Sequence, residues 1–75
     1  MLKRLDLHGL VYEEARAEVI HFIEDNWDTI NELNIITGNS EGMRKVVTDV
    51  ADEYKLNYSM PFDSNNVGEI RIFMI

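Results

Sequence analysis

Two periods of apolar residues alternate along this chain, and their order limits what it can fold into. Leu5 and Leu7 stand between polar neighbours, which is the two-residue period of a half-buried strand, and residues 33–37, 56–60 and 69–75 are further short strand candidates. Apolar residues three or four apart predict helices over residues 11–26 and about 43–54. The sequence therefore predicts the order strand, helix, strand, helix, strand, strand.

This order has few compact solutions in a chain of 75 residues. A strand, a crossover helix and a second strand form a right-handed parallel unit. We therefore expect an α+β fold, a two-layer sandwich (β-α-β-α-β-β) with both helices on one face of a four-stranded mixed sheet. A chain of this length buries only about 60% of the surface that it exposes when unfolded, so we expect residues 1–75 to form a single domain without a deep cavity.

Charge and composition exclude some functions and disfavour others. Fourteen acidic residues against seven basic ones give a net charge of −7, which disfavours nucleic acid because phosphate contacts need Lys and Arg. The acidic segment 13–32, with Arg16 as its single base, is expected to be a solvated helix face. The chain has no cysteine, no signal-peptide pattern and no membrane-spanning stretch, so we expect a cytoplasmic protein without a membrane partner.

Polar residues and glycines follow both of the first two strands. If Leu5 and Leu7 face the helices, Asp6 and His8 lie together on the open face, about 6–7 Å apart, at the carboxyl end of the first strand. Because the first two strands are parallel, the turn at residues 37–42 emerges at the same end, where ligands of open α/β sheets bind. His8, oriented by Asp6, could act there as a general acid or base, or the pair could simply brace the loop.

The turn at residues 37–42 has its own chemistry. Asn39 or Ser40 can cap the second helix, and Gly38 and Gly42 allow a ligand to approach the backbone closely. For Ser40 a capping role is favoured over that of a nucleophile, because no second histidine is at hand to activate it.

Two of the seven basic residues, Arg44 and Lys45, come directly after this turn. A helix N-terminus with two added cations predicts a phosphate site, and Arg71 would join them if it faces the open side of the sheet. The alternative is ion pairing of the two cations with Glu41 or Asp49 on the helix surface.

These motifs resemble those of the Smr domain, the small MutS-related domain. The run Leu5-Asp6-Leu7-His8-Gly9 together with Ala15 matches the first family motif, and Ile36-Thr37-Gly38-Asn39-Ser40 partly matches the second. Gly68, before a last apolar strand, is a third match, and the resemblance covers about residues 3–75. It implies a fold like that of the C-terminal domain of translation initiation factor three.

The resemblance also implies a function. Members of the family bind branched or structured nucleic acid, and several nick DNA or cleave RNA, which would make this chain a stand-alone endonuclease domain. The resemblance implies Asp6 and His8 as catalytic residues, with Thr37, Gly38 and Asn39 in a substrate loop. With the loop features above, the predicted nucleic-acid contacts are Gly9, Thr37, Gly38, Asn39, Ser40, Gly42, Arg44 and Lys45.

Two departures from the family motifs leave an alternative open. Thr37 stands where the family often has histidine, and Ser40 stands where a glycine is usual. Together with the net charge of −7, they favour a catalytically degenerate module that uses the same scaffold to bind another protein.

Metal ligation is predicted only in combination with a substrate. His8 and His21 fall on elements that do not obviously converge, so they do not predict a zinc site, and His21 is expected to be a partly exposed helix residue. Mg²⁺ could enter through Asp6 together with substrate phosphates.

Aromatic and apolar residues raise two further expectations. Base stacking is expected from Tyr58 or Phe73, if their strands turn them to the open face, while the aromatics expected in or near the core are Tyr12, Phe22, Trp27 and Tyr54. The last strand is apolar on both faces, so both of its faces would need to be covered by other parts of the chain or by a second subunit. A homodimer, formed edge to edge or face to face through this strand, is one way to provide this cover.

Overall fold

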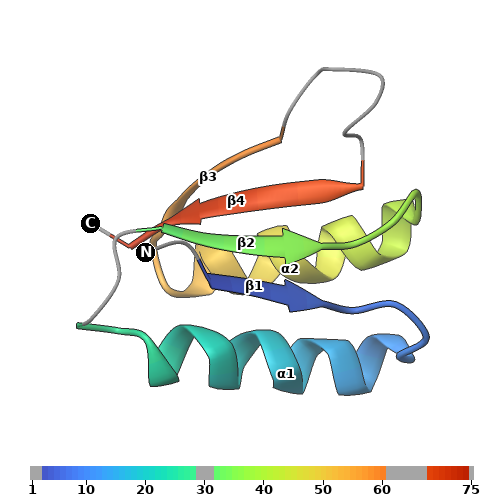
Figure 1. Cartoon of the computed structure of the whole chain (residues 1–75), viewed down its shortest axis with the longest axis horizontal. Coiled ribbons are helices and arrows are strands. Elements are labelled where there is room, and N and C mark those ends of the chain that lie inside the picture. The colour runs from blue at the N-terminus through green and yellow to red at the C-terminus, as the bar shows by residue number, and fades with distance from the viewer. Residues whose placement is uncertain (1–2, 29–31, 61–67, 75) are drawn as a thin grey trace.

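The computed structural model describes residues 3–28, 32–60 and 68–74, and these form a sheet layer and a helix layer (Figure 1). The elements follow the predicted order and confirm the α+β class. They are β1 (Lys3–Asp6), α1 (Tyr12–Asp25), β2 (Glu32–Ile36), α2 (Glu41–Glu53), β3 (Asn57–Ser59) and β4 (Glu69–Phe73).

The four strands form one mixed sheet in the order β1-β2-β4-β3. β1 and β2 are parallel, whereas β4 is antiparallel to both β2 and β3. Because β4 has a hydrogen-bonded strand on each side, it offers no free edge. The expectation of an edge-to-edge dimer through the last strand is therefore wrong, while a face-to-face dimer stays a prediction.

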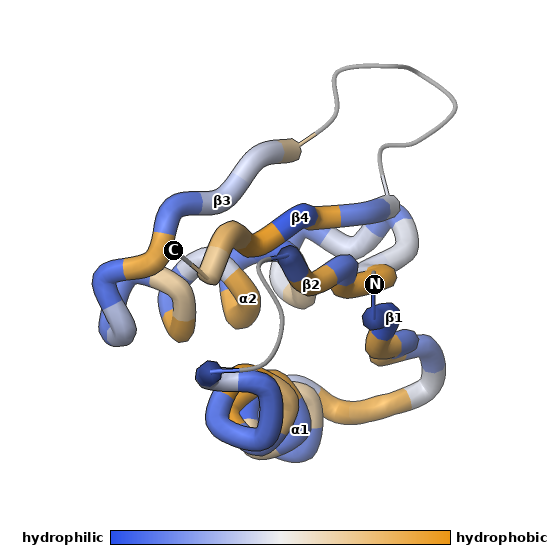
Figure 2. The backbone as a smooth tube through the Cα atoms, turned by 60° about the vertical axis from the view of Figure 1, so that its left-hand side comes forward, coloured by the Kyte–Doolittle hydropathy of each residue, from blue (hydrophilic) through white to orange (hydrophobic). Residues whose placement is uncertain are grey.

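Both helices cover the same face of the sheet (Figure 2), as the sequence predicts. Alternation along the strands sends one set of side chains beneath the helices and the other set to the open face. The buried set comes from all four longest elements and from the residue after β1: Leu7, Ala15, Val19, Ile23, Leu33, Ile35, Met43, Val47, Val50, Ala51, Ile70 and Ile72.

The aromatic residues divide differently from the expectation. Phe22 and Tyr54 are half-buried against the core, as predicted. Tyr12 and Trp27, expected in or near the core, are instead 55% and 47% exposed. Tyr12 is the first residue of α1 and Trp27 follows its C-cap, Asn26, so both lie at helix ends, where the apolar stripe no longer faces the sheet.

The start of α2 is fixed by the predicted cap. The Ser40 hydroxyl accepts a hydrogen bond from the backbone N–H of Met43 at 3.1 Å, which satisfies one of the N–H groups that a helix leaves without an internal partner. Neither this helix nor any other in the described segments is long and apolar enough to cross a membrane.

Candidate functional site

The loops after β1 and β2 leave the sheet at the same end, as the sequence predicts (Figure 1). Asp6 is paired in register with Ile36, and the backbone N–H of Leu7 donates to the carbonyl of Ile36 at 3.0 Å. β4 begins at this end too, directly after Gly68. We call this end of the molecule, residues 6–12, 37–45 and 68–69, the rim.

The first rim loop is a tight turn with His8 at its tip. The carbonyl of Leu7 accepts from the N–H of Leu10 at 3.2 Å, and Gly9 has a φ of +84°, which glycine adopts without strain. Asp6 Oδ1 accepts from the backbone N–H of His8 at 2.9 Å. Asp6 therefore braces the main chain of the turn rather than the imidazole, and His8 is exposed.

The second rim loop is attached to the start of β4 through its backbone. The carbonyl of Gly68 accepts from the N–H groups of Thr37 at 2.6 Å and Gly38 at 3.1 Å. Thr37 is 6% exposed, and its hydroxyl donates to the carbonyl of Gly38 at 3.0 Å. Thr37, predicted to contact nucleic acid, is thus placed beneath the loop as a support, whereas Gly38 and Asn39 are exposed.

Gly68 has a steric reason to be glycine. A Cβ at this position would lie 2.9 Å from the Cα of Gly38, closer than real Cβ atoms approach backbone. The late glycine of the sequence pattern thus allows β4 to pack directly against the second rim loop.

Tyr12 is a rim residue that the sequence reasoning assigned to the core. Its hydroxyl oxygen lies 3.5 Å from the Oγ of Ser40, and its ring occupies the space that a Cβ on Gly42 would take. Gly42, predicted to allow a ligand near the backbone, here accommodates Tyr12. The position of Tyr12 at the start of a helix, three residues after Gly9, is the sequence signal that could have indicated the rim.

The predicted cations are only partly gathered at the rim. Lys45 forms an i,i+4 ion pair with Asp49 at 3.4 Å, the alternative that the sequence left open. Arg44 is half-buried in the first turn of α2. Arg71 faces the open side of the sheet and pairs there with Glu32 at 3.0 Å.

The open face also contains a buried amide that the sequence reasoning missed. Asn34 alternates with Leu33 and Ile35, which are buried beneath the helices, so it faces the other side, between Arg4 and Arg71 in register. It is 1% exposed, and its Oδ1 has no hydrogen-bond partner among the described residues.

The two predicted stacking residues lie away from the rim. Tyr58 is paired in register with the buried Ile72 and packs against the core. Phe73 is at the far end of β4 from Gly68, half-buried, on the face opposite to Ile72. Of the two predicted stacking residues, therefore, only Phe73 faces the open side of the sheet.

Metal ligands are sparse at the site. The described segments contain no group of three or more His, Asp or Glu side chains placed to hold a metal ion. Mg²⁺ usually takes one or two protein carboxylates and completes its shell with water and phosphate oxygens. Asp6 is one such carboxylate, and its Oδ2 takes no part in the bond to the N–H of His8.

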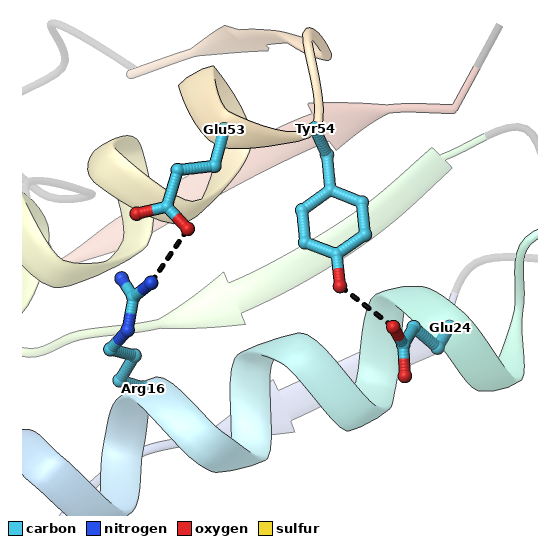
Figure 3. Close-up of polar contacts among 4 residues, drawn as sticks. All are labelled: Arg16, Glu24, Glu53 and Tyr54. Carbon is cyan, nitrogen blue, oxygen red and sulfur yellow. Dashed lines mark hydrogen bonds and ion pairs between the residues drawn. The ribbon is translucent and has the colours of Figure 1, made fainter.

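A second group of polar contacts joins the helices away from the sheet (Figure 3). Arg16 pairs with Glu53 at 2.6 Å, and the Tyr54 hydroxyl donates to Glu24 at 2.8 Å. The hydrogen bond that Arg16 donates to Glu53 raises the pKa of Arg16, and the bond that the Tyr54 hydroxyl donates to Glu24 raises the pKa of Tyr54. With Trp27, whose ring centre is 5.9 Å from that of Tyr54, we call these residues the interhelix cluster.

Comparison with known families agrees with the motifs. The sequence model of the Smr domain matches residues 5–69, which contain both rim loops. The chain belongs to the Smr domain family, which is associated with nucleic-acid binding and nuclease activity. No curated protein and no solved structure matches the chain significantly.

Proposed function

We propose that this chain binds structured nucleic acid at the rim and cleaves a phosphodiester bond there, with His8 as general acid or base. The observation that carries the proposal is the exposure of His8 at the tip of a backbone-braced turn, at the same end of the sheet as the glycine loop at Gly38. Both loops belong to the part of the chain that matches the Smr domain.

Phosphodiester cleavage requires proton transfer at two oxygen atoms, that of the attacking water and that of the leaving group. Hydrolysis of a phosphodiester removes a proton from the attacking water and delivers one to the leaving oxygen, while the P–O ester bond breaks. Histidine suits either transfer because an imidazole gains and loses a proton near neutral pH. His8 can perform one of the two, and water or a bound Mg²⁺ ion would assist the other.

Asp6 acts in this proposal as a positioning residue. Its carboxylate fixes the backbone N–H of His8, so it sets the direction of the Cα–Cβ bond from which the imidazole extends. Removing it would loosen the turn and leave the imidazole itself unchanged.

Phosphate contacts would come from the start of α2. The first N–H groups of a helix have no internal partner and favour anions, and Arg44 and Lys45 lie in or next to this turn. Glu41 and Glu69 lie at the same end of the molecule, so binding should depend on a few cations and weaken as salt rises, with a shallow slope set by their small number.

The competing function is a protein-interaction module without catalysis. Two observations favour it: the Asp6 carboxylate bonds to backbone rather than to the imidazole, and Thr37 stands buried where a histidine is frequent. This function needs the same fold and a different ligand.

Cleavage assays separate these functions. The purified chain would be incubated with end-labelled branched DNA and structured RNA, with and without Mg²⁺, beside His8→Ala and His21→Ala. His21 is the matched control because it is an exposed histidine in the second half of α1, away from the rim. We expect His8→Ala to lower the cleavage rate by about 100-fold or more and His21→Ala to leave it unchanged.

The other outcomes are equally informative. Binding without cleavage, weakened by Arg44→Ala and by salt, would leave a nucleic-acid-binding domain and remove the catalytic role of His8. Equal cleavage by the parent and His8→Ala would remove the catalytic role of His8 while leaving the nuclease activity. No binding to either nucleic acid would contradict the proposal and favour a protein partner.

A further inference from the structure

Tyr12 is an aromatic side chain exposed where a ligand of the rim would lie. Its exposed fraction, 55%, is the largest among the aromatic residues of the described segments, although it begins a helix whose other large apolar residues face the core. Val11 beside it is 61% exposed. A large apolar surface left open beside a proposed binding site needs an explanation that core packing does not give.

The ring of Tyr12 is supported from one side. Its hydroxyl end lies against Gly42 in the first turn of α2, where any larger residue would displace it, and the hydroxyl oxygen lies 3.5 Å from the Oγ of Ser40. Tyr12 contacts Gly42 on one side, and more than half of the residue is exposed, so part of the ring is open to solvent. A planar ring held in this way is a platform on which another planar group can stack.

The platform also lies near the proposed chemistry. Tyr12 lies four residues after His8 in the sequence. Its hydroxyl reaches Ser40 in the second rim loop. The ring thus bridges the two loops that would hold the substrate.

We propose that Tyr12 stacks on an unpaired base of the bound nucleic acid, so that the rim takes single-stranded or flipped-out nucleotides rather than continuous duplex. The inference rests on the proposed function and deepens it, since it names the structural class of the substrate. Bases inside a duplex are already stacked on their neighbours, and therefore only an unpaired or terminal base can cover the ring.

Binding measurements test this directly. Fluorescence anisotropy would compare labelled single-stranded RNA, single-stranded DNA of the same sequence and a blunt duplex, for the parent chain, Tyr12→Ala, Tyr12→Phe and Trp27→Ala. Trp27 is the matched control, because it is an exposed aromatic at the opposite end of α1, in contact with Tyr54. Thermal unfolding of each variant shows that it is folded at the assay temperature.

Stacking predicts a specific order of affinities. Tyr12→Ala should weaken single-strand binding about tenfold or more, whereas Tyr12→Phe and Trp27→Ala should stay within about twofold of the parent. The parent should prefer both single strands over the duplex. In the unmutated chain, photocrosslinking to an oligonucleotide containing 5-iodouracil should attach to the peptide with Tyr12, a result that does not depend on the folding of any variant.

The results that overturn the inference differ from those that overturn the proposed function. If Tyr12→Ala binds as tightly as the parent while Arg44→Ala is weakened, Tyr12 does not stack and the rim still binds nucleic acid. A parent that prefers duplex, or a crosslink that avoids Tyr12, would also show that Tyr12 does not stack on a base. If the parent binds none of the three but binds the branched DNA or structured RNA of the cleavage assay, the inference fails and the proposed function stands.

Discussion

The rim and the interhelix cluster are held together by different groups. At the rim, the carbonyl of Gly68 accepts two backbone hydrogen bonds, and Gly38 and Gly68 pack Cα against Cα. In the interhelix cluster, the contacts are between side chains: Arg16 with Glu53, and Tyr54 with Glu24 (Figure 3). One region is held together by main-chain contacts and the other by side-chain contacts.

This difference bears on which region can hold a ligand. Backbone contacts keep the rim in shape whatever its exposed side chains do, so His8, Asn39 and Tyr12 are left available for a partner. In the interhelix cluster the polar side chains are already paired with one another, so fewer of their polar groups are left for a ligand. This difference agrees with the rim as the proposed site, and substitutions in the two regions should have unequal effects.

The largest effect is expected where rim backbone meets rim backbone. Gly68→Ala would bring a Cβ to 2.9 Å from the Cα of Gly38, and neither strand nor loop can turn away as a flexible side chain could. Overpacking of this kind destabilises by about 1–3 kcal/mol, measurable as a lower urea midpoint. Ser59→Ala, at an exposed position on β3, is the control, and equal midpoints for the two would show that the rim is not fixed by this contact.

The next effect is expected from Asn34, which lies in the sheet and belongs to neither region. Its buried Oδ1 has no partner in the described part of the chain, and a buried acceptor left unpaired is unfavourable by about 1–3 kcal/mol. Asn34→Val, which also suits a central strand, should therefore raise the unfolding free energy by about 1 kcal/mol in urea titrations. A decrease would mean that the amide is hydrogen-bonded in solution and helps to hold the open face.

A smaller effect is expected where Tyr12 meets α2. Alanine is better than glycine inside a helix by about 0.5–1 kcal/mol, but a Cβ at position 42 must push the Tyr12 ring aside. Gly42→Ala should therefore stabilise the Tyr12→Ala variant more than it stabilises the parent chain. Equal gains in the two backgrounds, in a double-mutant cycle of urea unfolding, would mean that the ring does not rest on Gly42 in solution.

The sequence predicted the fold because each step was local. Two apolar periods define the elements, and a parallel pair sends both loops to one end, which is enough to place the loops of His8 and Gly38 at the same end of the sheet. The Ser40 cap follows from the residue preferences at helix starts. None of these steps requires knowledge of which side chains from distant parts of the chain meet.

The rim was predicted less completely, because its details depend on such distant pairs. The Tyr12–Gly42 and Gly38–Gly68 contacts join residues far apart in sequence, and no local pattern specifies them. Tyr12 also fitted the spacing of the apolar stripe, so periodicity assigned it to the core although the helix begins there. The burial of Thr37 follows from the same close approach of β4 to the loop.

The smallest effect is expected in the interhelix cluster, where it depends on pH. The hydrogen bond to Glu24, and to a lesser extent desolvation, raise the pKa of Tyr54, so the folded state favours the protonated hydroxyl. The resulting stabilisation is fully present below the ordinary tyrosine pKa of about 10 and is lost as the pH rises through the raised pKa. Tyr54→Phe should therefore lower the unfolding temperature slightly at pH 7, and the difference from the parent should vanish in strong alkali.

The neighbouring ion pair makes this test specific. Glu53 raises the pKa of Arg16 further above its already high ordinary value, so the Arg16–Glu53 pair stays charged over the pH range in which Tyr54 ionises. Glu24→Gln keeps an acceptor for the hydroxyl but removes the charge, and it should move the tyrosinate absorbance that titrates latest to lower pH. If the latest tyrosinate absorbance appears at the same pH in Glu24→Gln and in the parent, Tyr54 is not bonded to Glu24 in solution. The contrast between a rim held by backbone contacts and an interhelix cluster held by side-chain contacts would then fail.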